Sequence, residues 1–133
     1  MRNYLEQCRY KRRPVQLNAE VGAEVKKGNT AKKYLVPVKV INLSIQGCCI
    51  ITHTVLINGK HLFLEDIGSK EIEIRIYLPK DPINIPAKVI WFDYAEEYKG
   101  FKVGLSFGSI EDTNRNFLKR YLSSRDSAIK KVL

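Results

Sequence analysis

Alternation of apolar and polar residues with a period of two constrains the fold of this chain more than any other feature of its sequence. Between residues 15 and 25 every odd-numbered residue is valine, leucine or alanine, and the residues between them are polar or glycine. Because successive side chains of a β-strand point to opposite faces, this pattern predicts a half-buried strand. Comparable alternation predicts strands at residues 34–40, 72–78, 83–91 and 101–107, and the apolar run at residues 48–52 predicts a central strand buried on both faces.

Short connections with turn chemistry separate most of these predicted strands. Gly28 follows the first strand, a Pro-Lys-Asp-Pro sequence follows the strand at residues 72–78, and a polar hairpin around Glu96, Glu97 and Gly100 precedes the last strand. No helical pattern lies between the strands. We therefore expect a mainly β fold, an antiparallel barrel or sandwich rather than a parallel sheet.

Two segments fit the strand pattern less well. Pro37 lies within a predicted strand, which indicates an edge position or a bulge because proline cannot donate a backbone hydrogen bond. Residues 53–69 have no clear assignment. Asn58 and Gly59 predict a turn there, and residues 62–64 are compatible with a short strand or a packed loop.

The period of the apolar residues changes after residue 108. Ser109 and Asp112 resemble a capping box, and Phe117, Leu118, Tyr121 and Leu122 follow at helical spacing. We expect a C-terminal helix that covers the barrel or one of its openings. A chain of 133 residues is long enough for one core, so we predict a single domain with a basic arm at 1–13, a barrel at 14–108 and a helical segment at 109–133.

The charge of the chain favours anionic partners. Its formal net charge is +9, from 23 Lys and Arg against 14 Asp and Glu, and the excess is concentrated at the two ends. Solvated tails that maintain solubility are the alternative explanation. Three cysteines give no disulfide framework, and we expect no signal peptide and no membrane span, which together indicate a soluble cytoplasmic protein with reduced thiols.

Residues suited to catalysis are scarce. The sequence contains no nucleophile elbow, no phosphate-binding loop and no zinc-protease helix, and His53 and His61 are the available histidines. Cys48 and Cys49 are adjacent, so in a strand their side chains point to opposite faces and do not form one metal site. We expect no enzyme activity, no metal and no cofactor.

The candidate ligand site combines the end of the second predicted strand with the N-terminal arm. If that strand continues past residue 40, Asn42 and Ser44 continue its even-numbered face, which is the apolar one, and Gly47 permits a turn or a close backbone approach. Arg9 and Arg13 directly precede the first strand. Arginine can bond a phosphate or a guanine edge in bidentate fashion and can stack on a purine, while Asn and Ser supply further donors and acceptors. These residue types together describe a purine-phosphate pocket.

The pair of motifs Arg9-x-x-x-Arg13 and Asn42-x-Ser44-x-x-Gly47 resembles the signature of PilZ domains. A closing strand at residues 103–107 followed by an amphipathic helix is similar to the end of that family's domain. The resemblance implies a six-stranded antiparallel barrel that binds cyclic di-GMP without catalysis. It also implies that Arg9 and Arg13 grip phosphate and guanine, that Asn42 and Ser44 contact guanine or phosphate, and that Gly47 allows close approach.

A different alignment would use Arg12 as the first arginine and put glutamine at the second position, so Arg12 is kept as a secondary ligand residue. The leading hypothesis is a cyclic di-GMP receptor whose basic arm closes over the ligand and signals to an unidentified protein effector. Nucleic acid is not its expected partner. Two alternatives remain: a basic nucleic-acid-binding barrel that uses exposed aromatic residues such as Tyr77 and Phe92, and a PilZ-like adaptor that binds proteins but no ligand.

Overall fold

A computed structural model describes residues 13–57, 60–61, 63 and 71–132 of the chain. Its elements, in chain order, are β1 (Arg13–Lys27), β2 (Thr30–Leu43), β3 (Gly47–Thr52), β4 (Leu56–Ile57), β5 (Lys60–His61), β6 (Glu71–Tyr77), β7 (Pro82–Ala95), the 3-10 helix η1 (Glu96–Tyr98), β8 (Gly100–Phe107) and α2 (Asp112–Val132). Each of the six strands predicted from the sequence corresponds to one long strand of this list. The two short strands β4 and β5 pair with each other and stand apart from the main sheet.

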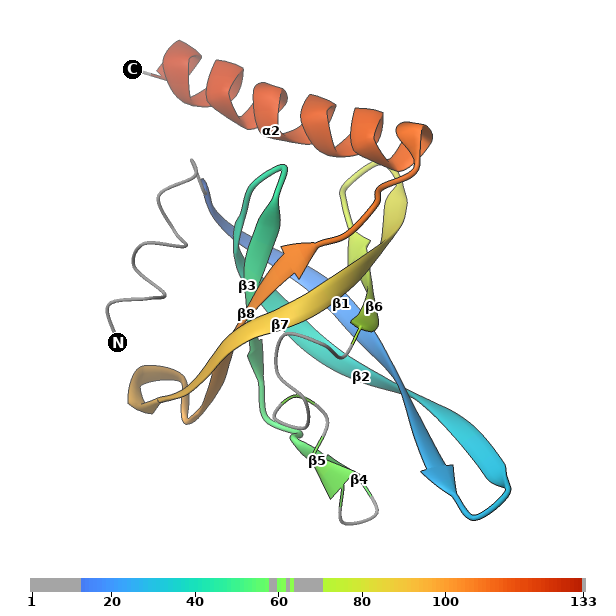
Figure 1. Ribbon diagram of the computed structural model, residues 1–133. Coiled ribbons are helices and arrows are strands. Elements are labelled where there is room, and N and C mark those ends of the chain that lie inside the picture. Colours follow the sequence, from blue (N-terminus) through green and yellow to red (C-terminus); the bar gives the residue numbers. More distant parts are fainter. Residues whose placement is uncertain (1–12, 58–59, 62, 64–70, 133) are drawn as a thin grey trace.

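The six long strands form a closed barrel in the order β1-β2-β3-β8-β7-β6, and every neighbouring pair is antiparallel (Figure 1). Closure gives each of these strands a neighbour on both sides over part of its length, which satisfies backbone groups that an open sheet would expose. The predicted mainly β class, with a six-stranded antiparallel barrel and a C-terminal helix, is confirmed.

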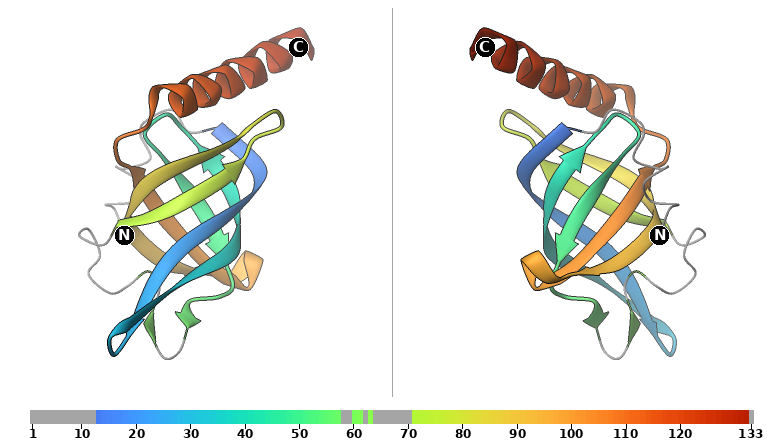
Figure 2. Two further views of the ribbon diagram at one scale, coloured as in Figure 1. Left: turned by 90° about the vertical axis from the view of Figure 1, so that its right-hand side faces the viewer. Right: turned by 90° about the vertical axis from the view of Figure 1, so that its left-hand side faces the viewer.

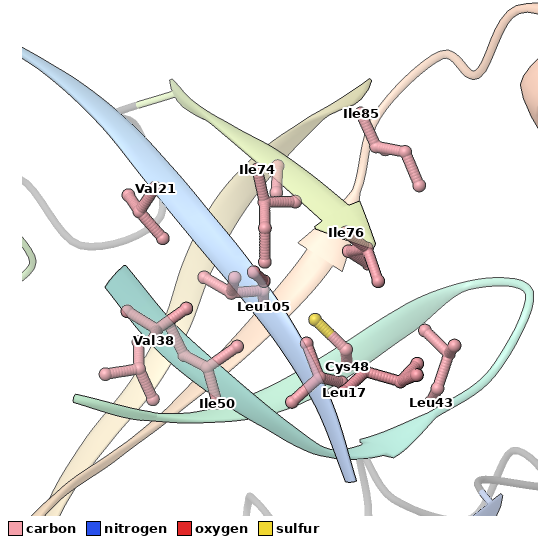
Figure 3. Close-up of a cluster of buried hydrophobic side chains, with 14 of the residues drawn as sticks. Leu17, Val21, Val38, Leu43, Cys48, Ile50, Ile74, Ile76, Ile85 and Leu105 are labelled. Atoms are coloured by element: carbon pink, nitrogen blue, oxygen red, sulfur yellow. The ribbon is translucent and has the colours of Figure 1, made fainter. Parts of the chain in front are cut away.

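The interior of the barrel is filled by the apolar residues of the alternating pattern. In β6 the isoleucines at 72, 74 and 76 are buried, and Glu71 and Glu73 are exposed. Ile74 is paired with Val21 of β1 on one side and with Ile85 of β7 on the other. Figure 3 shows these side chains in one buried cluster with Ile50 and Leu105. Closing the sheet into a barrel therefore buries the apolar faces of all six strands in one core.

Two β-bulges change which residues face this core. Between Val40 and Asn42 the pairing with β3 contains one extra residue, Ile41, so that Leu43 rather than Asn42 is fully buried. The expectation that Asn42 continues the even-numbered apolar face is therefore wrong. An extra residue inserted in one strand exchanges the inward and outward faces beyond it.

The second bulge lies in β7, between Val89 and Trp91. The alternation at residues 83–91 predicts Trp91 on the apolar face of its strand, but the residue is partly exposed and its indole lies against Gly104. Phe92 is turned inward instead, where its ring stacks on Phe101 with centroids 5.0 Å apart. It also stacks on the fully buried Phe63 at 6.4 Å, so Phe63 belongs to a packed loop.

The β1–β2 hairpin extends beyond the rest of the barrel, as Figures 1 and 2 show from different sides. It turns at Gly28, whose φ of +64° is a conformation that favours glycine. Pro37 is paired with Glu20 of β1, and β3 meets β2 only from Lys39 onward. Proline is therefore accommodated where β2 has no second neighbour, as expected for a local edge position.

The helix α2 crosses one end of the barrel (Figures 1 and 2). Leu118 is fully buried, and Phe117, Tyr121 and Leu122 pack against the core at the predicted helical spacing. The side chain of Asn114 donates to the carbonyl of Asn84 in β7 at 3.0 Å. The helix therefore closes this opening, as the sequence predicts.

The start of the helix differs from the predicted capping box. The helix begins at Asp112, and the amide of Arg115 donates to the carbonyl of Glu111 at 2.9 Å, which makes Glu111 the residue at the N-cap. Ser109 lies two residues earlier, outside the first turn. The prediction of a cap at Ser109 was therefore wrong, and the connection from β8 to α2 is longer than the sequence pattern indicated.

Candidate functional site

The turn between β2 and β3 is held by the hydroxyl of Ser44. This oxygen accepts hydrogen bonds from the amides of Gln46 at 3.1 Å and Gly47 at 3.2 Å, and the hydroxyl donates to the carbonyl of Gly47 at 3.3 Å. The backbone amide of Ser44 donates to the same carbonyl at 2.9 Å. Serine favours such turns because its short side chain can replace backbone partners. Ser44 is only 3% exposed, so its hydroxyl is used within the turn.

Gly47 begins β3 and is buried beside Ser106 of β8. Within the part of the chain that the structure describes, Gly28 is the glycine with a positive φ, so the conformation at Gly47 does not itself require glycine. The neighbouring carbonyl of Gln46 accepts from the amide of Phe107 at 2.9 Å, which fastens the turn to β8. The backbone of the turn therefore gives no conformational reason for glycine at position 47.

Asn42 is partly exposed and lies outside the core because of the bulge at Ile41. It is paired with Pro14 of β1, and Arg13 is paired with Leu43. The Cα atoms of paired residues in antiparallel strands lie about 4.5–5.5 Å apart. The last residue of the predicted arm is therefore adjacent in space to the residues that precede the Ser44 turn.

The structure brings together Arg13, Asn42, Ser44 and Gly47, four of the five residues of the predicted site, although it describes only the backbone of Arg13. Arg9 and the secondary residue Arg12 lie outside the described residues. The backbone at the start of β1, where the sequence has a cationic residue, therefore lies beside Asn42 and the Ser44 turn. This combination suits a ligand with negative charge and hydrogen-bonding edges.

Tyr77 and Lys102, which lie outside the candidate site, have raised pKa values. The hydroxyl of Tyr77 donates to the Glu20 carboxylate, and this hydrogen bond is the main reason that the pKa of Tyr77 is raised. The ammonium of Lys102 donates to Glu97 at 2.9 Å, which raises the pKa of Lys102. Both pairs stabilise the strand surface rather than prepare a group for proton transfer.

Other kinds of site find little support in the described residues. His53 is exposed, and one ring nitrogen lies 3.1 Å from the carbonyl oxygen of Tyr98. Over residues 13–57, 60–61, 63 and 71–132, no group of three or more His, Cys, Asp or Glu side chains could hold a metal ion. In the same residues, no helix is both long enough and apolar enough to cross a membrane.

The aromatic platform that a nucleic-acid-binding barrel requires is altered by the second bulge. Phe92, expected on the polar face with Tyr77, is instead packed inward against Phe101. Tyr77 is 41% exposed, but its hydroxyl is bonded to Glu20. On this strand face the partly exposed Trp91 therefore takes the place predicted for Phe92, in addition to Tyr77.

Residues 6–124 match the sequence model of a protein family described as PilZ domain. Structures with a similar fold include the Bacillus subtilis inhibitor of motility MotI/DgrA, at 17% identity and a TM-score of 0.63, with 90% of this chain and 51% of that chain covered. The PilZ domain with c-di-GMP of YcgR from Escherichia coli is 14% identical with a TM-score of 0.60, covering 93% of this chain and 95% of that one.

A longer YcgR chain in complex with c-di-GMP gives 13% identity and a TM-score of 0.59, with 92% of this chain and 47% of that chain covered. The chain thus spans about half the length of MotI and of this longer YcgR chain. At these identities the likeness concerns the fold. No curated protein sequence matches the chain.

Proposed function

Because the chain belongs to the PilZ domain family, as the match over residues 6–124 shows, we propose that it is a non-catalytic receptor for cyclic di-GMP that signals to a protein partner. The observation that carries this proposal is the pairing of Arg13 with Leu43, which sets the start of β1 beside Asn42 and the Ser44 turn. Two solved structures of similar fold, both of YcgR, contain c-di-GMP. A receptor for a second messenger acts in the cytoplasm, and that location is part of the proposal.

The ligand rests on a fixed platform formed by Asn42 and Gly47. Asn42 is partly exposed, and its amide both donates and accepts, which suits a guanine edge or a phosphate oxygen. Gly47 offers no side chain to block the approach of the ligand. Ser44 contributes by holding the turn between them, because its hydroxyl already bonds two amides and a carbonyl.

Arg13 and Arg9 supply the guanidinium groups of the proposed site, and Arg12 is a secondary contact. Their planar guanidinium groups bond phosphate or guanine O6 and N7 and stack on a purine face. Ligand binding draws the arm over the platform, and the closed arm changes the surface offered to the partner. No step of this process requires a catalytic residue, a metal or a cofactor.

The free energies set the scale of the effect. A micromolar dissociation constant corresponds to a binding free energy of about 8 kcal/mol, and this net value already includes the cost of ordering the arm. A bidentate arginine contact contributes roughly 1–3 kcal/mol, so losing Arg13 should weaken binding about 5-fold to 150-fold.

Calorimetric titration of cyclic di-GMP into the wild type, Arg13→Ala and Arg115→Ala tests the proposal. Arg115 is exposed in the first turns of α2, so its replacement removes the same charge at a residue outside the proposed set of ligand residues. We expect wild-type affinity for Arg115→Ala and a 5-fold to 150-fold loss for Arg13→Ala. Absence of heat with the wild type, or equal affinity in all three proteins, would contradict the proposal and would favour an adaptor without ligand.

A further inference from the structure

A cleft of about 690 Å³ lies between α2 and the turn that joins β6 to β7. Figures 1 and 2 show this turn beneath the helix, at the same end of the barrel as the β2–β3 turn. The cleft volume falls within the range of about 300–1,000 Å³ that is usual for ligand pockets. The fold therefore provides a second concave surface that the proposed cyclic di-GMP site does not use.

The inner lining of the cleft is apolar and aromatic. Leu78 is almost fully buried, Pro79 extends the apolar surface along the turn, and the rings of Phe117 and Tyr121 project from α2 on consecutive turns. Phe117 and Tyr121 are each only partly buried by the core beneath them. Their remaining ring surface is available to pack against an aromatic or large aliphatic side chain.

The sides of the cleft carry an excess of positive charge. Lys80 from the turn and Lys119 and Arg120 from the helix line it, against the single carboxylate of Asp81. All three cations are exposed. The ion pairs found among the described residues involve Lys33, Lys99 and Lys102 and none of these three side chains. Their charge is therefore not neutralised by an ion pair within the described part of the chain.

We propose that this cleft is the docking site for an acidic segment of a partner protein, one that inserts an aromatic or large aliphatic side chain between Phe117 and Tyr121. The helix side of the cleft runs from Phe117 to Ser124, about 10 Å at 1.5 Å per residue, which matches two turns of a docked helix. Carboxylates that flank the inserted side chain pair with Lys119 and Arg120 at the rim.

The charge of the chain disfavours its own N-terminal segment and a second copy as occupants of the cleft. Its own N-terminal segment of residues 1–12 contains four Lys or Arg residues against one Glu, and a second copy carries the same net charge of +9. Like charges brought together oppose association. The partner is therefore a different and acidic protein. This inference goes beyond the proposed receptor function and does not require that cyclic di-GMP binds.

A random peptide display library provides the test, with the full chain as bait. Enriched peptides are then measured by fluorescence polarisation against the wild type and two charge-reversal variants. Lys119→Glu with Arg120→Glu alters the cleft. Lys32→Glu with Lys33→Glu makes the same charge change on the β1–β2 hairpin, which extends from the opposite end of the barrel (Figure 1). Cyclic di-GMP titration of both variants reports separately on the receptor function.

We expect enriched peptides with net negative charge and an aromatic or large aliphatic residue. Their affinity should fall about tenfold or more for the cleft variant and less than twofold for the hairpin variant, since two attractive pairs become repulsive only in the cleft. Neutral or basic consensus peptides, equal loss in both variants, or no enrichment would overturn the proposal. So would self-association of the chain through the cleft, measured by sedimentation and abolished by the cleft variant.

Discussion

Replacing Ser44 by alanine should destabilise the protein through the β2–β3 turn. The hydroxyl is 3% exposed and accepts from the amides of Gln46 and Gly47, so the substitution removes the acceptor of two amides in a largely dry environment. A net loss of about 1 kcal/mol for each hydrogen bond gives a cost of about 2 kcal/mol in the free energy of unfolding. The donated bond to the Gly47 carbonyl adds little, since that carbonyl keeps the Ser44 amide.

Urea denaturation of the wild type, Ser44→Ala and Ser109→Ala measures this effect. Ser109 is exposed before α2, so its replacement should change stability by less than about 0.5 kcal/mol. The melting temperature of Ser44→Ala should fall by roughly 6–10 °C for a domain of this size. Equal stability of the two variants would refute the structural role of the Ser44 hydroxyl. Because the turn carries the proposed ligand platform, the affinity for cyclic di-GMP should fall as well.

Three other predictions concern the barrel itself. In Gly104→Ala the new Cβ would lie 2.0 Å from Nε1 of Trp91, so urea denaturation should show a loss of about 1–3 kcal/mol in the free energy of unfolding. This loss should disappear when Trp91 is also replaced by alanine, and additive effects of the two substitutions would contradict the contact. Carbon NMR should show that Tyr77 ionises above the usual pKa of 10.0 and that Glu20→Ala lowers the pKa of Tyr77. Because the folded-state pKa is raised, the stabilisation by the Tyr77–Glu20 hydrogen bond is complete below about pH 10 and is lost as pH rises through that pKa. An unchanged titration of Tyr77 in Glu20→Ala would contradict the hydrogen bond. Gly28→Ala should cost about 1 kcal/mol of unfolding free energy from its positive φ alone, since the space around the new Cβ is open, and an unchanged denaturation midpoint would argue against this turn conformation.

The alternating pattern predicted the six strands because a closed barrel buries one face of each strand and exposes the other. It could not predict the bulges at Ile41 and Ile90, since each lies beside consecutive apolar residues that fit either face of the strand. Each bulge exchanged the faces beyond it. As a result Asn42 left the core face that was predicted for it, and Phe92 entered the core.

The candidate site could be predicted only in part from the sequence. The paired motifs identified Arg13 and Asn42 as neighbours, and the β1–β2 pairing brings their backbones together. That Ser44 uses its hydroxyl inside the turn depends on the local geometry of the chain, which residue types alone do not determine. The cleft at Lys80 and Lys119 joins segments far apart in sequence, so only the folded chain reveals it.

The most direct test of the central claim is to follow the backbone amide resonances while cyclic di-GMP is added. The account predicts that resonances of Arg13, Asn42 and Gly47 shift in proportion to ligand bound, together with those of the arm that carries Arg9. Resonances of Gly28, at the far hairpin, should stay unchanged. Saturable shifts centred elsewhere on the barrel, or no shifts at all, would contradict the claim that the ligand lies between the arginine arm and the Ser44 turn.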